Sequence, residues 1–370
     1  MNIAHVESSL HWGGQELRTL EQMEWLRRHG HRVWLVARAQ AEIMKEAQKR
    51  GFPTYSLEIR NSFNPILIYK LIGFLRKNQI DIVDAHSSKE GTQLFFIKML
   101  TGIKVVRSRH ISNSVKHDFF HRLIWKYGND RVITTANTIK QDLIALNLDK
   151  DKIDVAIPGV DEKRFYPQLR QANRSLKKTL GIPEHHQIVA NIGMIREDKG
   201  QLFFVHACQQ IAHRLADVSF IQVGEATASS RSYKEQVLDA ARRLGLETKI
   251  HFLGYQSAIE HYLSISDIVI IASIGTEGQT RLVSQAFLTK TAVVATAVGG
   301  LPEMIIPGQT GLLCPPASAQ ALAEAAITLL QDTHQREQLC ENAFNYASKH
   351  LLFDKMMEAM LRSYRQATGP

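Results

Sequence analysis

The chain has 370 residues, of which 44% are hydrophobic and 22% are charged, a composition typical of a soluble globular protein with two domains. The sequence has no run of about 18 apolar residues, the length that could span a bilayer. The first residues lack the basic start and apolar block of a signal peptide. Three cysteines, Cys208, Cys314 and Cys340, have no paired spacing, so we expect reduced thiols in a cytoplasmic protein.

The net charge of +9 is unevenly distributed along the chain. Residues 1–178 contain 30 Lys and Arg against 18 Asp and Glu, a net charge of +12, whereas the remaining residues contain 15 against 18, a net charge of −3. A basic first half favours an anionic partner, such as lipid headgroups, a phosphorylated acceptor or nucleic acid. A basic surface that serves only solubility is the alternative.

The first half of the chain alternates short apolar runs with longer amphipathic segments. Residues 13–30 have apolar side chains at helical spacing and end at a glycine, which predicts a helix. The predicted strands lie at residues 2–7, 32–38, 54–59, 80–86, 104–110, 131–136 and 152–158. Alternating strands and helices predict a parallel, doubly wound α/β sheet.

The apolar pattern lapses at residues 159–186, where charged residues and prolines gather as at a domain boundary. The alternation then restarts, with predicted strands at residues 186–195, 218–224, 249–255, 267–273 and 292–296. We therefore expect two Rossmann-like α/β domains that face each other across a cleft. The expected boundaries are residues 1–170 for the first domain, 171–350 for the second, and 351–370 for a terminal helix that packs on the first domain.

In open α/β sheets, ligands bind at loops that follow the carboxyl ends of strands. Four such loops are prominent, at residues 8–16, 193–201, 276–287 and 295–305. The first contains Gly13 and Gly14, which either let a ligand approach the backbone before a helix or form a plain turn. The second contains Arg196 and Lys199, which either neutralise a diphosphate or are simply solvated. The first lacks the spacing of a dinucleotide-binding motif, and the second lacks that of a P-loop.

The third loop, TEGQTRLVSQAF, joins a polar turn to an apolar helix. Its backbone amides can point at an anion, and Glu277 can accept hydrogen bonds from sugar hydroxyls. Gln285 follows eight residues later, about two helical turns, so both side chains can lie along one ligand. The alternative is that Glu277 binds no ligand and only stabilises the N-terminus of the helix. The fourth loop, ATAVGGLPEMI, predicts a tight turn, with or without a ligand.

In their order and spacing, these loops resemble those of the family 4 (group 1) retaining glycosyltransferases, which have the GT-B fold. The resemblance covers nearly the whole chain and rests on GGQE, DIVDAHS, PGVDEKRFYP, GMIREDKG, HFLGY, TEGQTRLVSQAF and VATAVGGLPEMI. It implies that the second domain binds a nucleotide-diphosphate sugar and the first domain an acceptor. It also implies transfer with retention of anomeric configuration and without an essential metal.

The resemblance implies roles for individual residues. Lys199 matches the lysine that holds the donor diphosphate, and Glu277 matches the acid that contacts the transferred sugar. Gln285 stands where a second acid binds the ribose, and an amide can still hydrogen-bond to a diol. Met194 occupies the place of the family arginine, for which Arg196 is the nearest cation.

Other residues of the expected site follow from the same resemblance. His110 resembles the family histidine near the transferred sugar, so the expected catalytic residues are His110, Glu277 and Lys199. The expected diphosphate-binding residues are Gly14, Arg196, Lys199, Thr280, Arg281 and Leu282. Tyr255 is a candidate for contact with the base, and Gly13 and His86 are candidates for contact with the acceptor.

No metal or other cofactor is expected, because fixed cations and helix amides can stabilise a diphosphate leaving group. His117 and His121 have helical i, i+4 spacing but no evident third ligand.

We expect a hexosyltransferase whose acceptor is lipid-linked or a surface glycan of the lipopolysaccharide or capsule type, because a basic first domain suits a membrane face. Such an enzyme would be cytoplasmic and peripheral to the inner face of the membrane. A sugar-nucleotide epimerase and a non-catalytic nucleotide-sugar-binding protein are the open alternatives. Nucleic-acid binding is not expected, because the basic residues lack an aromatic platform or a recognisable motif.

Overall fold

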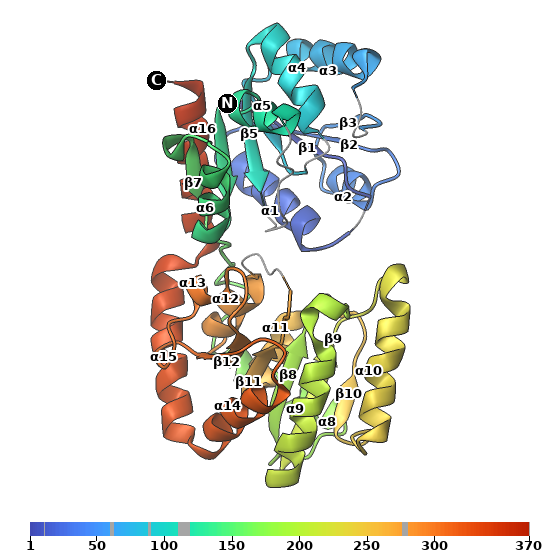
Figure 1. Cartoon of the computed structure of the whole chain (residues 1–370), viewed down its shortest axis with the longest axis vertical. Coiled ribbons are helices and arrows are strands. Elements are labelled where there is room, and N and C mark those ends of the chain that lie inside the picture. Colours follow the sequence, from blue (N-terminus) through green and yellow to red (C-terminus); the bar gives the residue numbers. More distant parts are fainter. Residues whose placement is uncertain (11, 60–62, 88–89, 110–118, 276–279, 370) are drawn as a thin grey trace. The chain divides into compact units, whose positions relative to one another are not determined.

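A computed structural model describes residues 1–10, 12–59, 63–87, 90–109, 119–275 and 280–369. Contacts between residues divide the chain into two compact units. Unit 1 comprises Met1–Ile157 and Met356–Pro370, and unit 2 comprises Pro158–Lys355. Each unit is a parallel sheet covered by helices (Figure 1), so the prediction of two Rossmann-like domains is confirmed.

The sheet of unit 1 has seven strands in the order β3-β2-β1-β4-β5-β6-β7. The strands are β1 (Asn2–Glu7), β2 (Arg32–Ala37), β3 (Thr54–Ser56), β4 (Ile82–Ala85), β5 (Lys104–Arg109), β6 (Arg131–Thr134) and β7 (Ile153–Val155). All seven fall within the predicted segments. Their side chains are mostly buried, as expected for a parallel sheet with helices on both faces.

Unit 1 also contains six α-helices among its described residues and most of a seventh. These are α1 (Gly14–Arg28), α2 (Glu42–Lys49), α3 (Pro65–Lys77), α4 (Gly91–Thr101), α5 (Phe119–Tyr127), α6 (Asn137–Ala145) and, from residue 356 onward, α16 (Phe353–Thr368), with the short 3₁₀ helix η1 (Lys150–Lys152). The start of α3 shows the local logic. Asn64 accepts hydrogen bonds from the amides of Ile66 and Leu67, and Pro65 occupies the first helical turn.

The terminal helix α16 packs on unit 1, as the sequence predicted. Tyr364 lies on this helix and donates a hydrogen bond of 2.5 Å to Asp84 on β4. The amide of Gln22 on α1 also contacts the sulfur atom of Met360. The end of the chain is therefore joined to the first sheet by buried polar contacts.

The sheet of unit 2 has six strands in the order β10-β9-β8-β11-β12-β13. They are β8 (Gln187–Ile192), β9 (Val218–Val223), β10 (Ile250–Phe252), β11 (Ile268–Ile271), β12 (Ala292–Thr296) and β13 (Leu312–Cys314). The sequence predicted the first five. It did not predict β13, because three residues after a glycine are too short a run to be distinguished from a loop.

The helices of unit 2 cover both faces of this sheet. They are α7 (Leu169–Ala172), α8 (Ser175–Thr179), η2 (Glu197–Lys199), α9 (Gln201–Arg214), η3 (Ala228–Ser230), α10 (Arg231–Arg243), α11 (Ile259–Ile265), α12 (Arg281–Leu288), α13 (Leu301–Met304), α14 (Ala319–Gln331) and α15 (Thr333–His350). The order of strands reverses between β8 and β11 in this sheet and between β1 and β4 in the first. Ligands bind at such switch points in open α/β sheets.

Candidate functional site

In unit 2, two loops at the switch point are joined by main-chain hydrogen bonds. The carbonyl oxygen of Asp198, in the loop after β8, accepts from the amides of Ile274 at 2.9 Å and Gly275 at 3.4 Å, in the loop after β11. The structure therefore joins the second predicted loop to the segment that leads into the third, at the carboxyl edge of the sheet. Lys199 lies half-buried at the end of η2, next to this junction.

Gly200 explains why these loops can approach so closely. Its φ of +68° lies in the left-handed region, and an added Cβ would lie 2.0 Å from the carbonyl oxygen of Ala272. A side chain at this position would push apart the backbones that follow β8 and β11. The glycine of REDKG is thus a requirement of the loop geometry.

Arg196 is engaged by its own loop. Its guanidinium makes two hydrogen bonds to the carboxylate of Asp198, one of 2.6 Å from Nη2. Burial alone would raise the pKa of Asp198, but the hydrogen bond and charge of Arg196 outweigh burial and lower it. The ion pair between Arg196 and Asp198 therefore holds the turn that carries Lys199 and compensates part of the charge of Arg196.

The third loop leads into α12, whose first turn contains several predicted residues. Thr280 is the N-cap, and its hydroxyl oxygen accepts from the amide of Leu282 at 3.3 Å. That amide, which was expected to face an anion, is satisfied by the cap. Arg281 is half-buried at the start of α12, and Gln285 is buried within it. Glu277 lies outside the described residues.

Tyr255 follows β10 and has 69% of its surface exposed. It lies at the carboxyl edge as well, because the preceding Gly254 accepts a hydrogen bond from Gly224, which follows β9. Gly224 has a φ of +132°, and an added Cβ would lie 1.9 Å from the carbonyl oxygen of Gly193. The loops after β8, β9 and β10 are thereby packed backbone to backbone.

In unit 1, Gly13 is the extended N-cap of α1 and Gly14 is its first residue. Neither has a left-handed φ, and among the described residues an added Cβ would meet no atom within 4 Å at Gly14 and only a side-chain oxygen of Glu16, at 3.6 Å, at Gly13. The backbone conformation therefore does not require these two glycines. They leave open space at the start of α1, beside the switch point of the first sheet.

Two buried acids, Glu7 at the end of β1 and Glu90 at the start of α4, hold the first loop in place. Glu7 accepts from the amide of Ser9 at 2.9 Å and from the side chain of Gln15 at 2.6 Å. Glu90 accepts from the amide of Ser8 at 2.7 Å. Burial, and then the charge of Glu90, raises the pKa of Glu7 to about 8. The glycines of this loop pointed to it in the sequence, whereas nothing in the sequence pointed to the two acids.

His86 is buried beneath this edge and belongs to a polar network. Its Nε2 lies 2.8 Å from Nδ1 of His5, and Asp84 lies within 4 Å of both rings. Tyr364 and Ser108 donate to Asp84. Burial lowers the pKa of His5 and of His86 to about 3, so both rings are neutral at pH 7.

The three groups His5, Asp84 and His86 are close enough to hold a metal ion. A nitrogen–nitrogen distance of 2.8 Å is, however, that of a hydrogen bond. We therefore describe the cluster as a hydrogen-bond network that joins β1, β4, β5 and α16. His86 is placed to position the first loop, because its carbonyl oxygen accepts from Gln15 at 3.3 Å.

Two further predicted residues, His110 and His117, lie outside the described residues, whereas His121 lies half-buried on α5. The structure consequently brings Lys199, Arg196 and the start of α12 to one edge of unit 2, and Gly13, Gly14 and His86 to one edge of unit 1.

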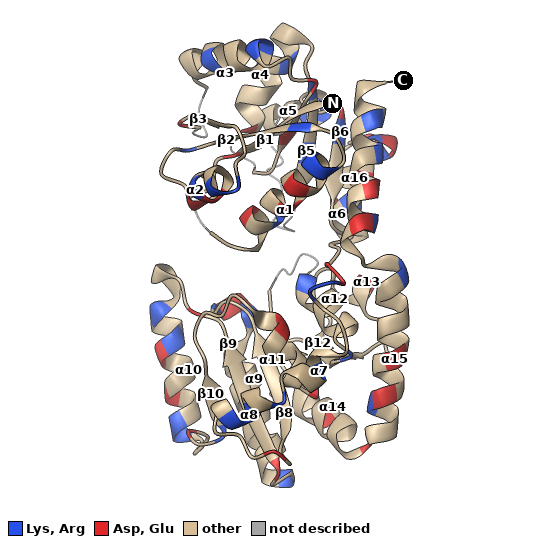
Figure 2. Ribbon diagram, turned by 180° about the vertical axis from the view of Figure 1, so that it is seen from behind, with Lys and Arg blue, Asp and Glu red and all other residues tan. Residues whose placement is uncertain are grey.

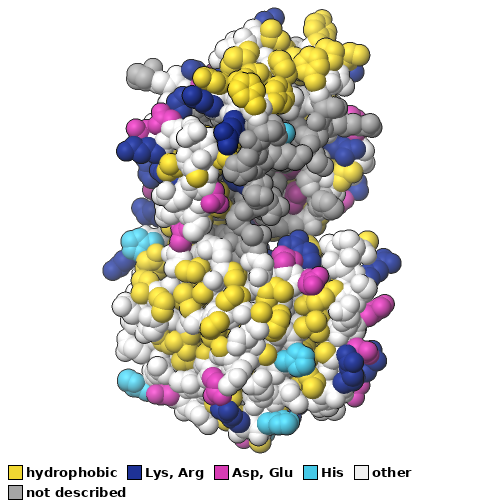
Figure 3. Space-filling view, in the orientation of Figure 1, with side chains coloured by type: hydrophobic (Ala, Val, Ile, Leu, Met, Phe, Trp, Pro, Cys, Tyr) yellow, Lys and Arg dark blue, Asp and Glu magenta, His cyan; other side chains and the backbone are white. Residues whose placement is uncertain are grey.

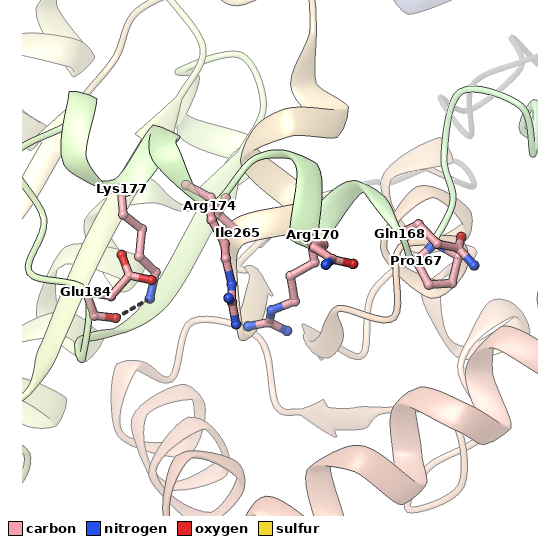
Figure 4. Close-up of a pocket in the computed structure, with 8 residues that line it drawn as sticks. Pro167, Gln168, Arg170, Arg174, Lys177, Glu184 and Ile265 are labelled. Atoms are coloured by element: carbon pink, nitrogen blue, oxygen red, sulfur yellow. Dashed lines mark hydrogen bonds between the residues drawn. The ribbon is translucent and has the colours of Figure 1, made fainter.

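A cavity of about 560 Å³ lies elsewhere in unit 2 (Figure 4). Glu184 and Ile265, which line it, precede β8 and β11, so the cavity is at the amino edge of the sheet, opposite the predicted donor loops. Arg170 pairs with Asp267 at 2.5 Å, and Lys177 donates to two main-chain carbonyl groups. These cations serve the packing of α7 and α8, and the sequence pointed to no ligand there.

Comparison with known proteins identifies the two halves. Residues 172–346 match the family model described as Glycosyl transferases group 1, and residues 12–164 match the one described as Glycosyltransferase Family 4. The chain is 26% identical over 296 residues to the D-inositol 3-phosphate glycosyltransferase of Corynebacterium glutamicum (strain R), an alignment covering 75% of this chain and 71% of that protein.

Two solved structures share the fold. The crystal structure of Anabaena Alr3699/HepE in complex with UDP has a TM-score of 0.85 and 21% identity, over 98% of this chain and 99% of that one. The structure of WaaG, described as a glycosyltransferase involved in lipopolysaccharide biosynthesis, has a TM-score of 0.72 and 16% identity, over 100% of both chains.

Proposed function

This chain belongs to the group 1 and family 4 glycosyltransferases, and from that premise we propose that it transfers a hexose from a nucleotide-diphosphate sugar to a lipid-linked or surface-glycan acceptor. Its two Rossmann-like units are those of the predicted GT-B fold. The family match favours a transferase over the epimerase and the non-catalytic binding protein that the sequence left open.

The observation that carries the donor half of the proposal is the junction of the Lys199 loop with the loop after β11. Asp198 joins these loops through its carbonyl oxygen, and Gly200 lets them approach. A cation held at this junction, at a switch point, suits a diphosphate. A solved structure with the same fold contains UDP, which supports a nucleotide donor.

The chemistry that we propose needs no metal ion. As the anomeric bond breaks, negative charge develops on the departing diphosphate, and a fixed ammonium group can stabilise it. Lys199 is the residue that we assign to this role, with Arg196 holding its turn. The expected product retains the anomeric configuration of the donor.

The acceptor half of the proposal rests on unit 1. Open space at Gly14 lies beside a loop fixed by Glu7 and Glu90. A relative is named for D-inositol 3-phosphate and a structural neighbour for lipopolysaccharide biosynthesis. Both names suit a hydroxyl acceptor, and the second suits one of the cell envelope. The basic first half suits a peripheral position on the inner face of a membrane.

The donor site is tested by titrating the purified chain with UDP, GDP, ADP and their sugar conjugates while thermal unfolding is followed by calorimetry. A ligand that binds only the folded state raises the unfolding temperature. We expect one base to be preferred and its effect to be lost in Lys199→Ala. The exposed Lys178→Ala, in the same unit, is the matched control. If no nucleotide raises the unfolding temperature, the donor-site proposal is wrong.

A further inference from the structure

The exposed hydrophobic side chains of this protein are concentrated on three helices of unit 1. Of the thirteen large hydrophobic residues that are most exposed among the described residues, eight lie on or directly before α3, α4 and α5. They include Ile66, Tyr69, Leu100 and Phe119, which are 67%, 79%, 67% and 81% exposed. Figure 3 shows hydrophobic side chains gathered over the part of unit 1 where Figure 1 draws α3 and α4.

These side chains lie on neighbouring helices, because α4 packs against both α3 and α5. The hydrophobic core of unit 1 does not depend on these exposed side chains. In α3, the opposite side of the helix already supplies the core through Leu67, Leu71 and Phe74. Contiguous apolar surface of this kind marks an interaction site in a soluble protein. We call the exposed surface of these three helices the α3–α5 face.

The charges of the α3–α5 face have a single sign. No Asp or Glu occurs in any of the three helices. Their exposed cations are Lys70, Arg76 and Lys77 on α3 and Arg122 and Lys126 on α5, and Figure 2 shows Lys and Arg along α3. The one other cation, Lys98, is paired with Asp130 at 2.6 Å.

The charge of the whole unit agrees. Unit 1 contains 26 Lys and Arg against 17 Asp and Glu, whereas unit 2 contains 19 of each. The net charge of +9 therefore belongs to unit 1. This uneven distribution of charge creates a positive electrostatic potential around the α3–α5 face, which attracts anions, and leaves unit 2 neutral overall.

We propose that the α3–α5 face is the surface by which the protein lies on an anionic lipid bilayer. Its aliphatic and aromatic side chains enter the headgroup layer, and its five exposed cations contact the lipid phosphates. A surface of apolar residues interspersed with Lys and Arg, and without acids, is complementary to the headgroup layer of an anionic bilayer, which carries negative phosphates above apolar acyl chains. Among the described residues no helix is long and apolar enough to cross a membrane.

This inference extends the proposed function, since it names the surface that brings the enzyme to a lipid-linked acceptor. It does not depend on donor chemistry, because adsorption to a bilayer needs neither nucleotide nor acceptor. Failure of vesicle binding and failure of nucleotide binding are therefore separate results.

The test is flotation of the full chain with vesicles of phosphatidylglycerol and phosphatidylethanolamine, compared with vesicles of phosphatidylcholine alone. We expect binding to the anionic vesicles and weaker binding as salt screens the cations. The triple variant Lys70→Glu, Arg122→Glu and Lys126→Glu should weaken binding by about 100-fold or more, given the usual contribution of each cation near an anionic surface.

The matched control reverses three exposed cations of unit 2, in Lys178→Glu, Arg231→Glu and Arg243→Glu. It changes the net charge equally and should retain binding within severalfold. A second variant, Ile66→Ser, Leu100→Ser and Phe119→Ser, should lose roughly tenfold or more without any change of charge. All three variants should keep the nucleotide response of the wild type.

Three outcomes would overturn the proposal. The first is equal binding to neutral and anionic vesicles, and the second is loss of binding in the unit 2 control. The third is absence of vesicle binding together with self-association that the serine variant abolishes, because the α3–α5 face would then join two copies of the chain.

Discussion

Replacing Tyr364 by phenylalanine tests how the end of the chain is held to unit 1. The change removes a single hydroxyl group from α16 and keeps the fully buried ring. That hydroxyl donates to Asp84 at 2.5 Å, and the hydroxyl of Ser108 is the second side-chain donor, at 3.1 Å. Burial raises the pKa of Asp84, so a lost donor leaves a poorly solvated carboxyl group in the core.

The expected cost follows from this geometry. A lost partner for a buried polar group costs about 1–3 kcal/mol, with the higher value for an ionised acceptor. Unit 1 has 172 residues, namely 157 from Met1–Ile157 and 15 from Met356–Pro370. For a domain of this size, each kcal/mol lowers the unfolding temperature by roughly 2–4 °C. We therefore expect a decrease of about 2 to 12 °C.

The sequence supplies a reporter for unit 1 alone. All four tryptophans, Trp12, Trp25, Trp34 and Trp125, lie in this unit, so their fluorescence follows its unfolding without a contribution from unit 2. The control is Tyr69→Phe, which removes a hydroxyl group from a residue that is 79% exposed. A Tyr364→Phe variant that melts within about 1 °C of this control would refute the role of the network in anchoring α16.

Two further variants test the loops at the two sheet edges. Gly200→Ala should destabilise unit 2 by roughly 3 kcal/mol in calorimetry, because the left-handed φ and the clash with Ala272 each contribute about 1–2 kcal/mol or more. The control Gly245→Ala, with the same φ of +68° and open space around it, should lose only the contribution of the left-handed φ. Equal losses of stability in the two variants would contradict the clash. Glu7→Gln should change the pH dependence of unit 1. The raised pKa of Glu7 gives the wild type a contribution to stability that is complete below pH 4.5 and lost as pH rises toward 8. Over this range the unfolding temperature of the variant, followed by tryptophan fluorescence, should therefore rise relative to that of the wild type. Unfolding temperatures with the same pH dependence in both proteins would show that Glu7 titrates normally.

The strands were predictable because each is a short apolar run between polar segments. The contacts that define the two edges were not. Tyr364 and Asp84 lie 280 positions apart, and no local pattern relates a tyrosine of a terminal helix to an acid on a central strand. The left-handed φ of Gly200 could be suspected from REDKG, but its approach to Ala272 depends on how two distant loops pack.

Burial of acids was likewise invisible in the sequence. In the sequence, Glu7 is an ordinary polar residue at the end of an apolar run, and Glu90 lies within a polar segment. Only the fold shows that both are enclosed beside one loop. In contrast, the exposed side of α3 was concealed by its composition. PILIYKLIGFLRK contains enough apolar residues for a core helix, and the structure shows that Ile66 and Tyr69 are left outside it.

The central claim is that this chain moves a sugar from a nucleotide to an acceptor, and label transfer tests it most directly. The purified full chain would be incubated with a labelled nucleotide sugar of the base that it binds, a glycolipid or surface-glycan fraction, and EDTA. We predict label in the acceptor fraction with the anomeric configuration of the donor, unchanged in Lys178→Ala and lost in Lys199→Ala. A donor that binds but keeps its label, or one that is epimerised without any acceptor, would contradict the claim.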